Sequence, residues 1–210
     1  ATTNATMVDS DGLLKWRPHN LLPNSSVLNY TKLNTATSTS TVVSPSGLQD
    51  AVLVQPTVAT GVTWVYDPNE YNTGVVTTIS TFAKASGKSF VTMSNTNGTF
   101  QYVSFNLTTG AVGTVASGYT ANIEDFGNGW YRCSVTTPTG FNERAIYAVS
   151  DTDGGIAAAA NGNDGILLWG AQLNRSDLGG MVNNPDRGDS YVPTTSAAVY
   201  LSRRGHHIYN

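Results

Sequence analysis

The fold class can be argued from residues 130–136, which read WYRCSVT. Successive side chains of a β-strand point to opposite faces of its sheet, so a strand here divides these residues into two sets. One set is Tyr131, Cys133 and Val135, and the other is Trp130, Arg132 and Ser134. The first set predicts a side that faces the core. The second set mixes an aromatic ring with polar groups and predicts a side that faces away from it.

The same alternation is found in other short segments from residue 51 onward. In residues 100–107, Val103, Phe105 and Leu107 fall on the expected core side, whereas Phe100, Tyr102, Ser104 and Asn106 fall on the other. Residues 166–173 are apolar on both faces, which predicts a central strand and places Trp169 in the core. The expected strands are residues 51–55, 62–66, 75–84, 89–94, 100–107, 119–125, 130–136, 144–150, 166–173 and 191–201. This spacing predicts an all-β jelly-roll sandwich of about ten or more antiparallel strands.

The chain divides into a connector, a sandwich and a short tail. Residues 8–14 read VDSDGLL, a polar turn between apolar pieces, so residues 1–20 are expected to form a hairpin or connector. We expect it to pack on a neighbouring domain or on another copy of the chain. The sandwich is assigned to residues 21–201, with a connecting loop over residues 21–48. Residues 202–210 are expected to link to a further segment, because both ends read like cuts through a longer polypeptide.

The composition disfavours several classes of partner. Charged residues make up 12% of the chain and the formal net charge is -3, with no continuous basic stripe, so nucleic-acid binding is disfavoured. There is no apolar run of about eighteen residues, and we expect no membrane insertion. The single cysteine, Cys133, has no partner for a disulfide within the chain and is expected to serve packing.

Four motifs occur in an order that identifies a resemblance. They are FNLTTG at residues 105–110, IEDFGNGWYRCSVT at 123–136, LLWGAQL at 167–173 and SYVPTTSAAV at 190–199. Together with residues 5–14 and 20–25, they resemble a carbohydrate-binding-module-like domain found in bacteriophage tail fibres and other phage structural proteins. The resemblance implies a concanavalin-like jelly roll on the virion that is carried as a homotrimer. No enzymatic activity is expected, because no catalytic motif favours one, and the alternative to glycan binding is a purely structural assembly or decoration domain with no ligand. The implied partners are other virion proteins and a host cell-surface polysaccharide of unspecified sugar.

A face that binds sugar needs aromatic rings beside hydrogen-bonding groups. Tyr102, Trp130 and Arg132 meet this description on the side opposite the expected core. The residues Trp64, Tyr66 and Tyr71 are added because the turn-forming sequence DPNE at residues 67–70 would present them at an edge. The structural alternative is that Trp130 and Arg132 stack on each other or pack beneath the N-terminal connector.

Catalysis and metal binding are weaker hypotheses. Glycoside hydrolysis needs two carboxylates about 5 to 10 Å apart, and the glutamates are Glu70, Glu124 and Glu143. Because Glu124 and Asp125 are neighbours on one expected strand, they point to opposite faces and cannot pair with each other. No cofactor is expected. A structural calcium ion is the less favoured alternative for the Asp- and Gly-rich segments at residues 9–12, 151–154 and 161–165, which also read as ordinary turns.

Overall fold

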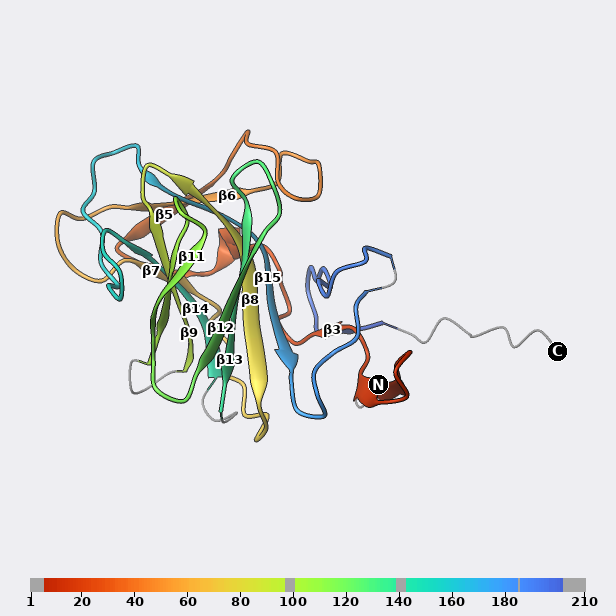
Figure 1. The fold of residues 1–210 in the computed structure, drawn as a ribbon. Helices are drawn as coiled ribbons and strands as arrows, with labels where there is room; N and C mark the ends of the chain where they lie inside the picture. The colour runs from red at the N-terminus through yellow and green to blue at the C-terminus, as the bar shows by residue number, and fades with distance from the viewer. Residues whose placement is uncertain (1–5, 97–100, 139–142, 185, 202–210) are drawn as a thin grey trace.

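The computed structural model describes residues 6–96, 101–138, 143–184 and 186–201, which form an antiparallel β-sandwich (Figure 1). We call its two six-stranded sheets sheet I and sheet II. Sheet I has the order β11 (Ala111–Val115), β10 (Val103–Asn106), β9 (Phe90–Thr96), β14 (Glu143–Ser150), β7 (Trp64–Tyr66) and β4 (Thr31–Leu33). Sheet II has the order β12 (Thr120–Asp125), β13 (Tyr131–Thr137), β8 (Thr77–Ser86), β15 (Gly165–Arg175), β6 (Val52–Pro56) and β5 (Thr35–Thr39).

Two small sheets and one short helix complete the described structure. Strands β1 (Thr6–Val8) and β2 (Leu14–Trp16) form the hairpin expected at the N-terminus. Strand β3 (His19–Asn20) pairs with β16 (Val199–Tyr200), and a 3-10 turn covers Val27–Asn29. The prediction of an all-β sandwich with an N-terminal hairpin is therefore confirmed. Within the described ranges, no helix has the length and apolar character needed to cross a membrane.

The core lies between the two sheets and follows the predicted alternation in β10 and β13. Val103 and Phe105 from sheet I are fully buried, as are Cys133 and Val135 from sheet II. All four belong to one hydrophobic cluster that also contains Tyr147 of β14. Burial raises the pKa of the Cys133 thiol, so this residue is a neutral packing group, as the sequence predicted.

Strand β15 departs from the predicted alternation at a bulge. Its register against β8 shifts between Trp169 and Gln172, and Gly170 between them has φ +68°. An extra residue in one strand reverses the facing of the residues beyond it. Leu167 and Trp169 therefore face outward, whereas Ala171 and Leu173 face the core. The prediction that Trp169 is a core residue is wrong for this reason, and the residue is half-buried on the outer face of sheet II.

The N-terminal segment is held against the sandwich by the side chain of Asn20. Its Nδ2 donates to the carbonyls of Ala171, at 3.1 Å, and Val192, at 3.0 Å, while its Oδ1 accepts from the backbone N–H of Leu173 at 3.1 Å. Asn20 is completely buried, so these bonds satisfy groups that have no access to water. They tie the connector to β15 and to the segment that leads into β16.

Three boundaries differ from the sequence prediction. Residues 21–48, expected as a loop, contribute β4 and β5, and residues 111–115 form the unexpected strand β11. The expected strand at residues 191–201 is reduced to the two residues of β16. These strands are short or lie at a sheet edge, and their pairing depends more on the neighbouring strand than on their own composition. Phe100 and the expected linker at residues 202–210 lie outside the described residues.

Candidate functional site

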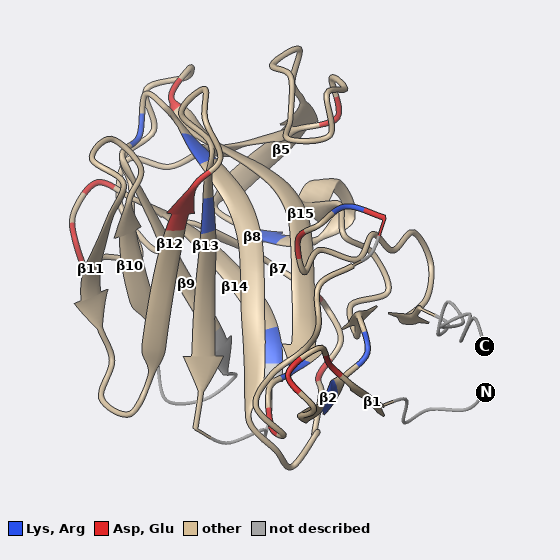
Figure 2. Ribbon diagram, turned by 45° about the vertical axis from the view of Figure 1, so that its right-hand side comes forward, with Lys and Arg blue, Asp and Glu red and all other residues tan. Residues whose placement is uncertain are grey.

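A polar groove of about 360 Å³ lies on the outer face of sheet II. Its lining residues are Thr78, Ser80, Glu124, Arg132, Ser134, Thr136, Asn174, Ser176, Gly179, Gly180, Met181 and Ser190. The floor comes from β12, β13, β8 and β15, and the loops that follow β15 supply one wall. Figure 2 shows this sheet from outside, with acidic residues on β12 and a basic residue on the adjacent strand β13.

The floor of the groove is polar because outward-facing positions of β8 and β13 carry hydroxyl groups, at Thr78 and Ser80 on β8 and at Ser134 and Thr136 on β13. Ser80 pairs with Ser134 and Thr78 pairs with Thr136 across the two strands, so the hydroxyls form two adjacent rows. The Oγ1 atoms of Thr78 and Thr136 are 2.6 Å apart and share a hydrogen bond. The alternate residues of the same strands face the core, so the strands that build the hydrophobic interior also position the groove.

Arg132 enters the groove from β13 and is 7% exposed. Its guanidinium carbon lies 5.3 Å from the centre of the Phe82 ring, which is the geometry of a cation–π contact. Its Nη2 donates to Ser80 Oγ at 3.3 Å. Burial lowers the pKa of Arg132, while Asp189 and Glu124 act in the opposite direction. An arginine remains protonated at neutral pH even in such surroundings, so the groove contains a fixed positive charge.

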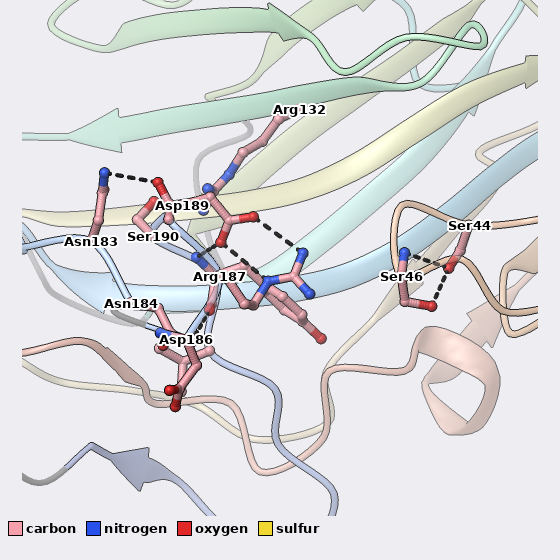
Figure 3. A network of polar contacts seen from close by, with 12 residues as sticks. Ser44, Ser46, Arg132, Asn183, Asn184, Asp186, Arg187, Asp189 and Ser190 are labelled. Carbon is pink, nitrogen blue, oxygen red and sulfur yellow. Dashed lines mark hydrogen bonds and ion pairs between the residues drawn. The ribbon is translucent and has the colours of Figure 1, made fainter.

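An aromatic cluster borders the groove beyond Phe82. The ring centres of Phe82 and Trp169 are 5.2 Å apart, and those of Trp169 and Tyr191 are 4.7 Å apart. Arg187 covers this cluster, with its guanidinium 5.3 Å from the Trp169 ring and 5.1 Å from the Tyr191 ring. Figure 3 shows Arg187 and Asp189 directed toward one another, with Arg132 extending toward the same loop. Two hydrogen bonds, of 3.2 and 3.1 Å, join the Arg187 guanidinium to the Asp189 carboxylate.

Trp130 lies in a second hollow of about 450 Å³ on the same face of sheet II. This hollow is bordered by residues 42–45, Gly47, residues 126–128 and Lys84. Trp130 is 3% exposed, and its indole N–H donates to the carbonyl of Val43 at 3.0 Å. The ring is therefore packed beneath a loop and does not form an open platform. The residues that cover it follow β5, whereas the sequence had suggested the N-terminal connector.

Three of the expected sugar-binding residues lie on the opposite side of the molecule. Trp64 and Tyr66 of β7 and Tyr102, just before β10, are half-buried on the outer face of sheet I. Trp64 and Tyr102 border one very small hollow of about 10 Å³. Arg144 lies over the Tyr66 ring at 5.0 Å and makes an ion pair with Glu70. This surface is aromatic, but it is not part of the groove.

Tyr71 lines neither the groove on sheet II nor the small hollow on sheet I. Its hydroxyl donates to Asp67 Oδ2 at 2.6 Å, and its ring packs partly against the core. Burial and this hydrogen bond raise the pKa of Tyr71 well above its ordinary value. The hydrogen bond to Asp67 ties Tyr71 to the turn that the sequence predicted at residues 67–70.

The expected grouping of Tyr102, Trp130 and Arg132 on one face is therefore wrong. Alternation along a strand shows which residues face away from the core, but not which of the two sheets holds the strand. Tyr102 directly precedes β10 of sheet I, whereas Trp130 directly precedes β13 of sheet II and Arg132 lies on β13. Sequence reasoning found Arg132 but missed the hydroxyl rows at Thr78, Ser80 and in β13. The signal for these rows was the run of polar residues at alternate positions of two strands that share a face with Arg132.

The Asp-rich segments form turns held by protein donors. Asp9 Oδ1 accepts from the backbone N–H groups of Asp11 and Leu13, both at 2.9 Å, and its other oxygen contacts Lys15. Asp153 accepts from the backbone N–H and the hydroxyl of Thr114. Across the described part of the chain, no group of three or more His, Cys, Asp or Glu side chains is placed to hold a metal ion.

The fold and the groove define an all-β sandwich with a hydrogen-bonding cleft on one sheet. No family model and no curated protein matches the chain. Among solved structures, it is similar to a glycoside hydrolase family 43 arabinoxylan arabinofuranohydrolase from Bacillus subtilis in complex with cellotetraose. The identity is 10% and the TM-score is 0.35, with 82% of this chain and 33% of that chain covered. The chain thus spans about a third of the length of that protein, and a likeness this distant carries no information on activity.

Proposed function

We propose that this domain is a non-catalytic part of a phage virion appendage and that it holds a host-surface glycan in the groove of sheet II. The observation that carries the proposal is the lining of the groove, where hydroxyl, amide, guanidinium and carboxylate groups converge on one cleft. Sugar hydroxyls both donate and accept hydrogen bonds, so they match a surface that offers both. The virion origin rests on the four sequence motifs described above.

A binding role fits the groove better than hydrolysis does. Among the described residues that line it, Glu124 is the single carboxylate, whereas glycoside hydrolysis uses a pair that flanks the scissile bond. Shallow, polar sites of this kind bind weakly, and several copies on one virion would multiply the affinity without any new contact. We propose a homotrimer as the form in which the copies are presented.

The proposal is tested by binding to a panel of purified bacterial surface polysaccharides, with Ser134→Tyr as the blocking variant. Ser134 is half-buried, and its hydroxyl makes one long hydrogen bond, 3.4 Å, to Asn122, so the larger ring is expected to fill the groove without unfolding the sheet. Tyr102→Ala, on the outer face of sheet I, is the matched control. We expect the parent and the control to bind and Ser134→Tyr to lose binding. Absence of parent binding, or unchanged binding by Ser134→Tyr, would contradict the proposal.

A second candidate is a purely structural role in assembly, which is favoured by the N-terminal hairpin. Val8, Leu13 and Leu14 are 58%, 58% and 52% exposed, respectively, so the hairpin presents apolar side chains to solvent. Such residues commonly contact another chain. If the domain forms a trimer that Leu13→Asp dissociates, and no polysaccharide binds, the assembly role replaces the binding role.

A further inference from the structure

The groove contains a buried arginine that has no carboxylate partner within the described residues. Arg132 is 7% exposed, and none of the ion pairs in this part of the chain includes it. Among the described residues, its one hydrogen bond is the 3.3 Å contact of Nη2 with Ser80 Oγ. A guanidinium has five N–H donors, and burying it unpaired is costly. This environment is suited to an anion that is supplied from outside.

The two nearest acids do not fill that role by contact. Asp189 accepts two hydrogen bonds from Arg187 and a third, at 2.8 Å, from the backbone N–H of Tyr191. Glu124 is exposed and accepts from the Asn122 amide at 3.0 Å. Asp189 is therefore committed to Arg187, and Glu124 remains in contact with water. The guanidinium donors of Arg132 that Ser80 does not use are left to the groove.

The surroundings of Arg132 also fix its direction. The Phe82 ring lies against the guanidinium, and Phe82 is fully buried, so the charge cannot move deeper into the protein. The hydroxyls of Ser134 and Ser190 line the groove with Arg132 and offer hydrogen bonds to the oxygens of a bound sugar ring. A planar guanidinium binds carboxylate and phosphate oxygens through two parallel hydrogen bonds.

We propose that the groove selects an acidic glycan and that Arg132 binds its anionic group, a carboxylate of a uronic acid or a phosphate diester. This inference rests on the proposed function and names the class of sugar that the site would hold. Glu124 lines the same groove, so it repels a bound anion and limits the affinity. The inference therefore predicts opposite effects for two variants, because removing Arg132 weakens binding and neutralising Glu124 strengthens it.

The test measures binding of the full chain to polygalacturonate, to the same polymer after reduction of its carboxyl groups, and to poly(glycerol phosphate). The variants are Arg132→Gln and Glu124→Gln, with Arg144→Gln as the matched control. Arg144 lies on sheet I, where it pairs with Glu70, so its loss removes an equal charge at a distance from the groove. Thermal melting of each variant shows whether it is folded.

We expect carboxyl reduction and Arg132→Gln each to weaken binding by about tenfold or more. Glu124→Gln is expected to strengthen it by about three- to tenfold, and Arg144→Gln to leave it unchanged. Binding of poly(glycerol phosphate) alone identifies phosphate as the source of the anion. Should Arg132→Gln fail to fold, carboxyl reduction and Glu124→Gln, which alters an exposed side chain, still decide the question.

The outcomes separate this inference from the function on which it rests. Equal binding to the acidic and the carboxyl-reduced polymer, or weaker binding by Glu124→Gln, overturns the assignment to acidic glycans while glycan binding stands. Failure to bind any of these polymers, together with a negative result on the polysaccharide panel, overturns both.

Discussion

Replacing Gly170 with alanine tests the bulge that separates the outward-facing Trp169 from the inward-facing Ala171 beside the groove. Gly170 has φ +68°, and a Cβ built there would lie 3.1 Å from both Phe82 Cδ2 and Tyr191 Cε2. The left-handed backbone costs an alanine about 1–2 kcal/mol. Close contact with two rings that are buried among other side chains adds about 1–3 kcal/mol. The expected loss in the free energy of unfolding is therefore about 2–5 kcal/mol.

Gly74 provides a matched control for the backbone component. Its φ is +69°, and a Cβ there would meet no atom within 4 Å, so Gly74→Ala should lose only about 1–2 kcal/mol. Urea unfolding of both variants, followed by circular dichroism, gives the difference between them. We expect Gly170→Ala to be less stable than Gly74→Ala by about 1–3 kcal/mol. Equal losses would refute the close approach of Phe82 and Tyr191 to the bulge.

Three further predictions concern the connector and the second hollow. Burial, reinforced by the positive charge of Arg175, lowers the pKa of His19 in the folded protein, so the unfolded chain binds the proton more readily. The stability due to neutral His19 is therefore complete above about pH 6.5. It is lost as the pH falls from there through the pKa of the folded state. Urea unfolding between pH 8 and pH 5 should show this loss in the parent and a smaller one in His19→Gln, and equal slopes would contradict it. Asn20→Ala leaves buried backbone groups unpaired and should lower the free energy of unfolding by about 2–5 kcal/mol. A similar loss of stability in the exposed control Asn183→Ala would show that the buried hydrogen bonds are not the cause. Trp130→Ala should cost about 3–5 kcal/mol, and a loss below about 1 kcal/mol would show that the loop does not cover the ring.

The sequence predicted those parts of the fold that depend on alternation within one strand. Val103, Phe105, Cys133 and Val135 are buried as expected, because a period of two residues fixes facing without reference to the partner strand. The same rule failed beyond Trp169, where one glycine in a left-handed conformation reverses the facing of the strand. The isolated glycine at position 170 was the one local sign of a bulge, but the apolar residues on both sides of it do not show where the facing changes.

The candidate site was predicted only in part, because it depends on contacts between distant segments. Trp130 is covered through a hydrogen bond to Val43, which lies 87 residues earlier in the chain. Tyr102 was grouped with Arg132, although Tyr102 lies beside β10 of sheet I and Arg132 lies on β13 of sheet II. Arg132 itself was identified, since alternation within residues 130–136 places it on the side that faces away from the core. That no carboxylate among the described residues pairs with it emerged only from the arrangement of the loops after β15.

Backbone amide chemical shifts, followed during titration with the best-binding polysaccharide fragment, show which face of the sandwich holds the glycan. We expect shifts that cluster at Ser80, Arg132 and Ser134 on sheet II, with Trp64 and Tyr102 unaffected. Shifts confined to the outer face of sheet I would place the ligand on the wrong side of the sandwich and contradict the assignment of the groove.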